Sequence, residues 1–295
     1  MDPYFFIDTF QSLASGLLYG TTYALIGLGF TLIFGVMHKI NLSYAAASIG
    51  GAYASILVLQ SVAAPVFLVF LLAALAGGLI GLLVYFTCFH FISPAHPLAM
   101  LMATLGMLLF IEEVIIHATH GVPIAYPSLL EGSIQVGEFF FRGDLIAVFL
   151  TACACMAGLL WLLHRTKLGL GTRAVAQQPT AARLCGIDIT AVNVQLFVIT
   201  GLLGGIAGAM IGSAVGALSP LLALPLTVKG LIVTVIGGLG SVPGAIVAGL
   251  AVGGLENLFQ FLRGVTERDL YVMLLLFGFL VLRPNGLFGS VSARD

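Results

Sequence analysis

Charged side chains are scarce in this sequence: only 8% of its 295 residues are Asp, Glu, Lys or Arg. A soluble domain carries roughly 25% charged residues, because its surface must face water. Here hydrophobic residues make up 60% of the chain, and the mean hydropathy is +1.15. The chain therefore cannot cover itself with charge, and we predict an integral membrane protein whose outer surface meets lipid. The net charge of −1 leaves no basic field that would attract nucleic acid, so we expect no such partner.

Nucleotide-binding and catalytic motifs are also missing. A P-loop needs a Gly-Lys-Ser/Thr sequence, whose backbone amides and lysine hold phosphates. None of the three lysines (Lys39, Lys167 and Lys229) follows a glycine. The histidines and cysteines show no zinc-binding spacing. We therefore predict a chain that is not an enzyme and binds neither a metal nor a cofactor.

The apolar segments predict an all-α membrane protein. A membrane-spanning helix needs about 20 mostly apolar residues. The N-terminus carries Asp2 and Asp8 without the basic region of a signal peptide, so we expect the first apolar segment to stay as a span. Eight or nine spans in one transmembrane domain, residues 1–295, follow from these segments: 13–36, 45–60, 65–89, 97–117, 145–163, 192–217, 224–236, 244–261 and 270–282.

Basic residues set the expected orientation. Cytoplasmic loops of membrane proteins are enriched in Lys and Arg, and the densest basic loop here is 164–190, with Arg165, Lys167, Arg173 and Arg183. Placing this loop in the cytoplasm puts the N-terminus outside and the C-terminus inside, with nine crossings. The loop is also the longest internal one and is compatible with a short helix, which Pro179 could begin and Gly186 could end.

Ionisable residues within apolar spans are costly and are candidates for function. Lys229 lies inside a span and is either part of a pathway or a lysine that reaches out to the interface. Glu112 and Glu113 lie about one turn from the external end of their span, and Glu256 and Arg263 flank another span end. We expect Lys229 to line a translocation pathway together with Asn41, Ser43 and Tyr44.

Two glycine patterns stand out. Gly204, Gly208, Gly212 and Gly216 recur every four residues, which predicts a helix face for close packing, within the chain or against a moving partner. The segment 237–244 is broken by glycine and proline and is either a tight turn or a re-entrant element. Its notable residues are Gly237, Gly238, Gly240, Ser241, Pro243 and Gly244.

Several of these segments resemble the permeases of branched-chain amino-acid ABC transporters, the LivH-like subunit more than its longer partner. The resemblance rests on GLLYGTTYALIGLGFTLIFGVMHKIN at 16–41, LMATLGMLLF at 101–110, GLGTRAVAQQPTAARLCGID at 169–188, VIGGLGSVPGAIVAGLAVGGLEN at 235–257 and LRPNGLFG at 282–289. It implies a multi-pass inner-membrane permease with a second permease subunit (a copy or a paralogue), two cytosolic ATPases that bind ATP and Mg, and a periplasmic solute-binding protein. It also implies an ATPase-coupling helix within 177–187, for which the candidate residues are Gln177, Ala181, Ala182, Leu184, Gly186 and Ile187.

The chain departs from the family pattern at one place. Ile40–Asn41 is followed by Leu42, Ser43 and Tyr44, where the family usually has Ala-His-Gly or Ala-Gln-Gly. The resemblance implies branched-chain amino acids as the substrate, and this departure leaves other amino acids, urea or small amides, and small carboxylates as alternatives. A transporter that works without ATP is a further alternative; it would need coupling carboxylates in mid-span, which are scarce in this sequence.

Overall fold

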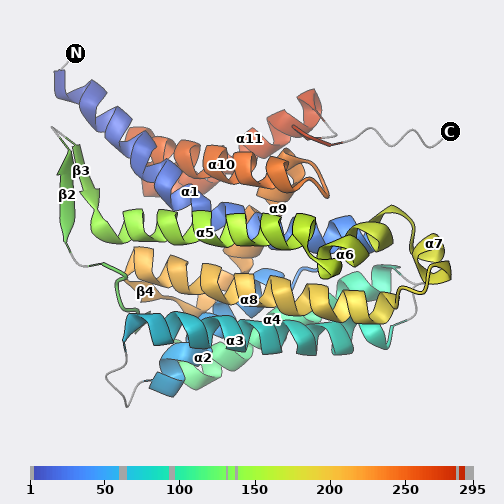
Figure 1. Cartoon of the computed structure of the whole chain (residues 1–295). Helices are drawn as coiled ribbons and strands as arrows, with labels where there is room; N and C mark the ends of the chain where they lie inside the picture. Colours follow the sequence, from blue (N-terminus) through green and yellow to red (C-terminus); the bar gives the residue numbers. More distant parts are fainter. Residues whose placement is uncertain are drawn as a thin grey trace.

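The computed structural model describes residues 3–59, 65–92, 97–130, 132–136, 139–283 and 286–289. Its helices lie lengthwise in one bundle, with a β-hairpin at one end and two short helices at the other (Figure 1). The α-helices are α1 (Pro3–Met37), α2 (Tyr44–Leu59), α3 (Val66–Val84), α4 (Pro97–Thr119), α5 (Gly143–Arg165), α6 (Lys167–Gln177), α7 (Pro179–Leu184), α8 (Ile189–Val215), α9 (Ala223–Gly237), α10 (Val242–Arg263) and α11 (Val265–Leu282).

Shorter elements complete the fold. A π-helix, Tyr85–His90, continues α3, and a 3₁₀ turn, Pro220–Leu222, precedes α9. Strand β2 (Ser133–Val136) pairs antiparallel with β3 (Phe139–Arg142), and β1 (Ile124–Ala125) pairs with β4 (Ala217–Leu218). These short strands lie at the helix ends, so the protein is all-α in its membrane-spanning part.

Seven helices of the described chain are long and apolar enough to cross a membrane. The apolar helix α2, with 16 residues, is shorter than these, and α11 carries three consecutive charged residues, Glu267, Arg268 and Asp269, near its start. Counting these two helices gives nine spans. The prediction of an all-α membrane protein with eight or nine spans is confirmed.

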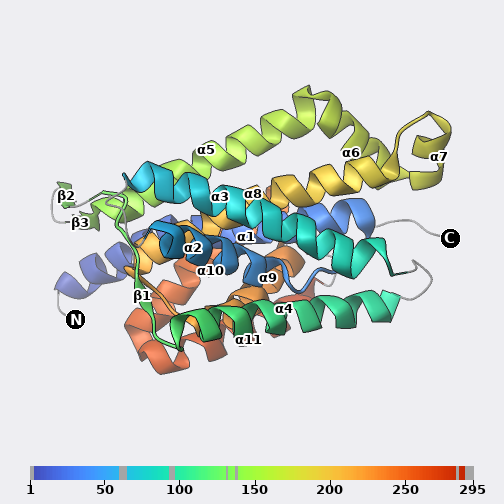
Figure 2. The same ribbon diagram turned by 90° about the horizontal axis from the view of Figure 1, so that it is seen from below.

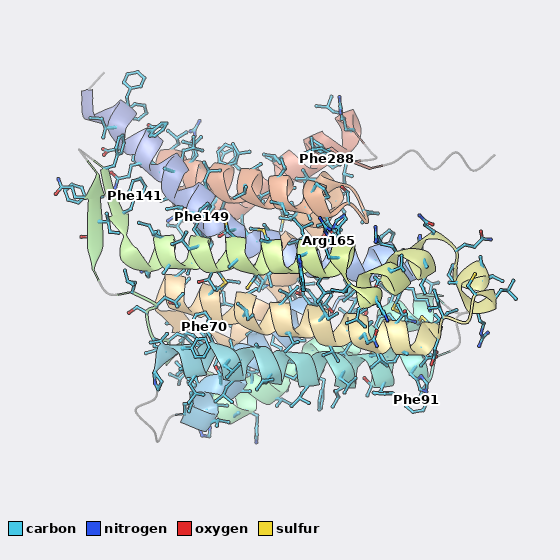
Figure 3. All side chains as sticks on the ribbon, in the orientation of Figure 1. Phe70, Phe91, Phe141, Phe149, Arg165 and Phe288 are labelled. Atoms are coloured by element: carbon cyan, nitrogen blue, oxygen red, sulfur yellow. The ribbon has the colours of Figure 1, made fainter. Side chains whose placement is uncertain are left out.

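The two ends of the bundle differ in character. The first turns of α1 lie beside the β2–β3 hairpin, whereas α6 and α7 lie at the opposite end (Figure 1, Figure 2). Figure 3 places Phe141 at the hairpin end and Phe91 near the opposite end, with Arg165 where α5 approaches α6. The basic 164–190 segment is therefore gathered at one end, which is the end expected to face the cytoplasm.

Glycines allow the closest helix contacts. A Cβ atom added to Gly253 of α10 would lie 2.2 Å from the Cα of Gly20 in α1, and one added to Gly77 of α3 would lie 2.5 Å from the carbonyl oxygen of Gly201 in α8. Small residues let helices approach in lipid, where no hydrophobic effect drives them together. Two helix pairs, α1–α10 and α3–α8, are built in this way.

The glycine stripe of α8 packs within the chain for most of its length. Gly204 and Gly208 lie against Ser48 of α2, and Gly212 lies against the ring of Tyr126. Gly216 differs from the expectation of a packing residue: its φ of 81° ends α8 in the left-handed conformation, and nothing lies within 4 Å of an added Cβ. A left-handed terminal residue favours glycine for conformational reasons.

The glycine-rich segment 237–244 is a tight turn between α9 and α10 in this structure. Gly238 and Gly240 have φ values of 99° and 85°, and the hydroxyl of Ser241 accepts a hydrogen bond from the backbone N–H of Gly244 to cap α10. Pro243 lies in the first turn of α10, where its missing N–H costs nothing. Of the two alternatives left open by the sequence, the structure has the turn.

Candidate translocation pathway and coupling surface

Lys229 belongs to a compact charged cluster. Its Nζ lies 2.8 Å from Oε1 of Glu256 and 3.2 Å from Oδ1 of Asp269. Nε of Arg268 lies 3.0 Å from the same Glu256 oxygen and 3.5 Å from Asp269 Oδ1. Two cations and two anions from α9, α10 and α11 therefore balance one another. The lysine is paired within the bundle rather than extended to the interface.

A tyrosine of α1 completes this cluster. Lys229 Nζ donates a hydrogen bond to the hydroxyl of Tyr23 over 3.3 Å, and that hydroxyl donates to Glu256 Oε1 over 3.1 Å. The Lys229 ammonium also lies 5.4 Å from the centre of the Tyr23 ring, within the range of a cation–π interaction. Because the side chains of Lys229 and Glu256 are only 12% and 5% exposed, these contacts replace the water that both ions lose.

Glu256 is part of a polar face of α10. Glu256 and Asn257 each lie three or four residues from Gly253 and from Gln260, so the four residues share one face of this helix. The amide of Asn257 donates to the backbone oxygen of Ser12 over 2.7 Å, which fixes this face towards α1. Gln260 in turn accepts a hydrogen bond from a terminal nitrogen of Arg268 over 3.1 Å.

A cavity of about 370 Å³ lies beside the cluster. Its polar wall comes from α1, α9, α10 and α11, and includes Tyr19, Tyr23, Lys229, Glu256 and Arg268. The facing wall comes from α5, α8, the turn before α9 and α9 itself. It is mostly apolar, and Arg142, just before α5, is its one charged residue among those described; the others are Leu145, Ile211, Ala214, Val215, Leu222, Pro225 and Leu226.

The cavity lies towards the hairpin end of the bundle. Apart from Ser15, Tyr19 and Tyr23 in the middle of α1, its lining residues come from the first halves of α9 and α11, the start of α5, and the second halves of α8 and α10. Lys229 and Glu256 are six and seven residues from the ends of their helices at this side, or about 10 Å at 1.5 Å per residue. The cluster is therefore one to two helical turns deep, on the side opposite α7.

Asn41, Ser43 and Tyr44 form a separate buried group at the start of α2. Oδ1 of Asn41 accepts hydrogen bonds from the backbone N–H and the hydroxyl of Ser43, and the Tyr44 hydroxyl donates to the backbone oxygen of Thr200 over 3.2 Å. Thr227 of α9 donates to the backbone oxygen of Leu42 over 3.4 Å. Residues two apart on a helix point about 200° apart, so α9 turns Thr227 to this group and Lys229 to the cavity. The structure therefore does not place the four expected pathway residues around one site.

The candidate coupling residues lie on and around α7. This helix begins at Pro179, directly after Gln178, and its Ala182 is buried, whereas Leu184 is 86% exposed. Gln177 ends α6, Ala181 is exposed on α7, and Ile187 is half-buried and donates its N–H to the backbone oxygen of Ala182 over 3.1 Å. Gly186 has a φ of 84°, which reverses the chain towards α8.

Short caps connect α7 to two long spans. The Thr166 hydroxyl accepts from the backbone N–H of Gly169 at the α5–α6 junction, and Asp188 accepts from the N–H of Thr190 at the start of α8. Only Gln178 separates α6 from α7. α7 is therefore linked to α5 through α6, and to α8 through residues 185–188.

Sequence reasoning missed the partners of Lys229. Glu256 was expected only to flank a span end, and Arg268 and Asp269 were not singled out, yet all three belong to the cluster around Lys229. The signal available was the polar face of α10. The pairing itself depends on how α9, α10 and α11 pack, and no local pattern specifies that.

The family described as "Branched-chain amino acid transport system / permease component" matches residues 12–282. This match covers most of the chain. The chain belongs to this family.

Known branched-chain amino acid permeases match this chain over nearly its whole length. It is 28% identical to the high-affinity branched-chain amino acid transport system permease protein BraD of Pseudomonas aeruginosa, over 95% of each chain. It is 25% identical to the permease protein LivH of Salmonella typhimurium, over 96% of each chain. The predicted LivH-like permease of an ABC transporter, a multi-pass protein of the inner membrane, is confirmed.

Solved structures share the fold. An inward-facing metal-chelate type ABC transporter matches with a TM-score of 0.51 and 14% identity, covering 93% of this permease and 87% of that chain. PsaBC from Streptococcus pneumoniae matches with a TM-score of 0.50 and 12% identity, covering 92% of this permease and 89% of that chain. These similarities support the ABC permease fold alone.

Proposed function

We propose that this permease carries branched-chain amino acids into the cell as the membrane subunit of an ATP-driven importer. The relatives named above are branched-chain amino acid permeases, and they match along the whole chain. Two cytosolic ATPase subunits would bind ATP and Mg, a second permease, either a copy or a paralogue, would complete the membrane part, and a periplasmic binding protein would deliver the solute.

The observation that carries this proposal is the exposed helix α7 at the basic end of the bundle. Its position between α6 and α8, with Leu184 projecting outward, suits a surface that a motor outside the membrane pushes on. The residues 177–187 are the proposed coupling segment, and Leu184 is its contact residue. Buried Ala182 holds α7 against its neighbours instead.

Transport would follow alternating access. ATP has a higher affinity for the closed ATPase pair, and only such differential affinity can shift a conformational equilibrium. Closure of the pair would move α7, and α7 would move α5 and α8. Because α5 and α8 also form the apolar wall of the cavity, this movement would change the cavity that lies towards the outer side.

Affinity purification tests the proposed assembly. The tagged permease is isolated from its native membrane, and the ATPase activity of the complex is measured with and without candidate binding proteins loaded with leucine, isoleucine or valine. The proposal predicts that two P-loop proteins co-purify and that a loaded binding protein stimulates hydrolysis. If only binding proteins loaded with urea, amides or carboxylates stimulate hydrolysis, the importer stands but branched-chain amino acids are not its substrate. Recovery of the permease alone, active in liposomes without ATP, would refute the importer.

A further inference from the structure

We infer that the cavity beside Lys229 is a binding site for a zwitterionic amino acid with an aliphatic side chain, formed by one copy of the permease. This inference rests on the proposed function and names the site that the substrate occupies during its passage. The evidence is the chemistry of the two cavity walls, the unused hydrogen-bonding capacity of the charged cluster, and the cavity volume.

The charged cluster has one unsatisfied acceptor and one unsatisfied donor. Within the described part of the chain, Oε2 of Glu256 accepts no hydrogen bond, although the residue is 96% buried. Nε of Arg268 is close to two carboxylate oxygens, but its N–H is directed at neither in a hydrogen bond. Buried polar atoms without partners are rare and call for an explanation. A ligand with one ammonium and one carboxylate group would supply both missing partners.

Lys229 has no N–H left to donate to Oε2 of Glu256. An ammonium group has three N–H donors, and those of Lys229 are matched by Glu256 Oε1, Asp269 Oδ1 and the Tyr23 hydroxyl. Rotation about the last torsion of a glutamate side chain is soft, so the carboxylate of Glu256 can turn Oε2 towards the cavity that it lines. Lys229 and Tyr23 are then positioning residues, which hold Glu256 Oε1 in place.

Arg268 offers the matching cation. Its side chain lines the cavity and is 29% exposed, and Gln260 accepts from only one of its terminal nitrogens among the described contacts. A guanidinium group presents five N–H donors in a planar fork that suits a carboxylate. Glu256 and Arg268 share the polar wall, so one small ligand can contact both.

The opposite wall suits an aliphatic side chain. Its apolar part consists of Leu, Ile, Val, Ala and Pro side chains and carries no aromatic ring. Arg142, just before α5, also lines the cavity, and its guanidinium is paired with Asp144 and bonded to the backbone oxygen of Ala214. Val215 is 57% exposed at the end of α8, and Leu226 is buried one turn before Lys229 on α9. The cavity volume of about 370 Å³ is at the lower end of the range for small-molecule sites, about 300–1,000 Å³. This size favours a single small amino acid over a peptide.

Saturation-transfer NMR on the purified complete transporter, without binding protein or nucleotide, tests the site directly. The probes are L-leucine, 3-methylbutylamine, which lacks the carboxylate, and 4-methylpentanoate, which lacks the ammonium. We expect L-leucine to bind at least tenfold more tightly than either analogue. Equal affinity for the three probes would overturn the zwitterion site.

Two variants connect this binding to the two walls. In Glu256→Gln, L-leucine should lose at least tenfold in affinity and bind no better than 4-methylpentanoate, whereas a purely structural carboxylate would leave that ratio unchanged. Val215→Trp fills the cavity without changing its charge and should also reduce L-leucine affinity at least tenfold. The matched controls are Glu113→Gln, at an exposed position of α4, and Leu224→Trp, on the outside of α9. The L-leucine affinity of both should stay within twofold of the wild type.

The outcomes separate this inference from the proposed function. If Glu256→Gln fails to assemble, as judged by size-exclusion chromatography, Val215→Trp decides the question. If the complex couples ATP hydrolysis to L-leucine uptake while Val215→Trp retains full binding and uptake, the proposed function stands and the cavity inference is wrong. If the wild-type transporter binds none of the probes, the inference is also wrong.

Discussion

Lys229 of α9 and Glu256 of α10 form an ion pair with 2.8 Å between Nζ and Oε1, on two helices joined by the glycine-rich turn at 237–244. The turn reverses the chain, so that residues 27 positions apart meet inside the bundle. Asp269 and Arg268 then extend the pair to α11. The buried pair and its two neighbours on α11 therefore link the last three spans.

Removing only the lysine should destabilise the permease. Lys229→Met leaves the Glu256 carboxylate buried beside a single cation, and breaking a buried ion pair from one side costs about 3–5 kcal/mol. The double variant Lys229→Met/Glu256→Leu should recover part of this loss, because neither ion remains. Thermal unfolding of the detergent-solubilised protein measures both. A double variant less stable than Lys229→Met alone would show that the pair does not explain the stability of this region.

The α1–α10 contact should tolerate no added methyl group. In Gly253→Ala the new Cβ would lie 2.2 Å from the Cα of Gly20, and overpacking of this kind costs about 1–3 kcal/mol. Gly158→Ala on α5 meets nothing within 4 Å and should be neutral or slightly stabilising, since alanine favours the helix. The same unfolding assay compares the two. If both variants are equally stable, α1 and α10 do not approach as closely at Gly20 and Gly253 as the structure shows.

Leu184 is the sharpest test of the coupling segment. It is 86% exposed on α7, so Leu184→Asp should leave the unfolding temperature unchanged and reduce binding-protein-stimulated ATPase activity at least tenfold. The control is the same kind of change at the opposite end, Val122→Asp, at a residue that is 60% exposed. Stimulation that survives in Leu184→Asp would exclude α7 as the contact with the motor. A charged residue at buried Ala182 would be less informative, because it would disturb α7 itself.

Cys185 reports the orientation of the bundle. It is exposed directly after α7, while Cys88 is buried and Cys153 and Cys155 are half-buried in the described structure. A membrane-impermeant maleimide should label Cys185 in inside-out vesicles and leave it unlabelled in right-side-out vesicles. In a Cys185→Ser background, Val122→Cys should show the opposite pattern. Labelling of Cys185 from outside would invert the orientation.

Composition and hydropathy were sufficient to predict the membrane fold, because a lipid-facing surface and a spanning length both follow from local apolar runs. They did not predict how far α1 extends: the expected span began at residue 13, but the helix begins at Pro3, because Asp8, Thr9, Gln11 and Ser12 interrupt the apolar run without ending the helix. The glycine spacing on α8 indicated a packing face, but the partner of that face, Ser48 on α2, is a property of the assembled bundle.

The candidate site was less predictable than the fold. Lys229 stood out because a charge in an apolar span is rare, yet its partners Glu256 and Asp269 are 27 and 40 positions further along the chain. Asn41, Ser43 and Tyr44 were expected beside it and instead contact one another and the backbone of α8. Which face of α9 meets which neighbour is decided by three-dimensional packing, and periodicity alone does not contain that information.

Reconstitution is the most direct test of the proposed importer. The purified complex is placed in liposomes with the stimulating binding protein, and uptake of labelled L-leucine is measured with ATP and with a non-hydrolysable analogue. ATP-dependent accumulation against a gradient, abolished by the analogue and lost in Leu184→Asp, is the predicted result. Equal uptake under both conditions, or accumulation driven by an ion gradient alone, would contradict it.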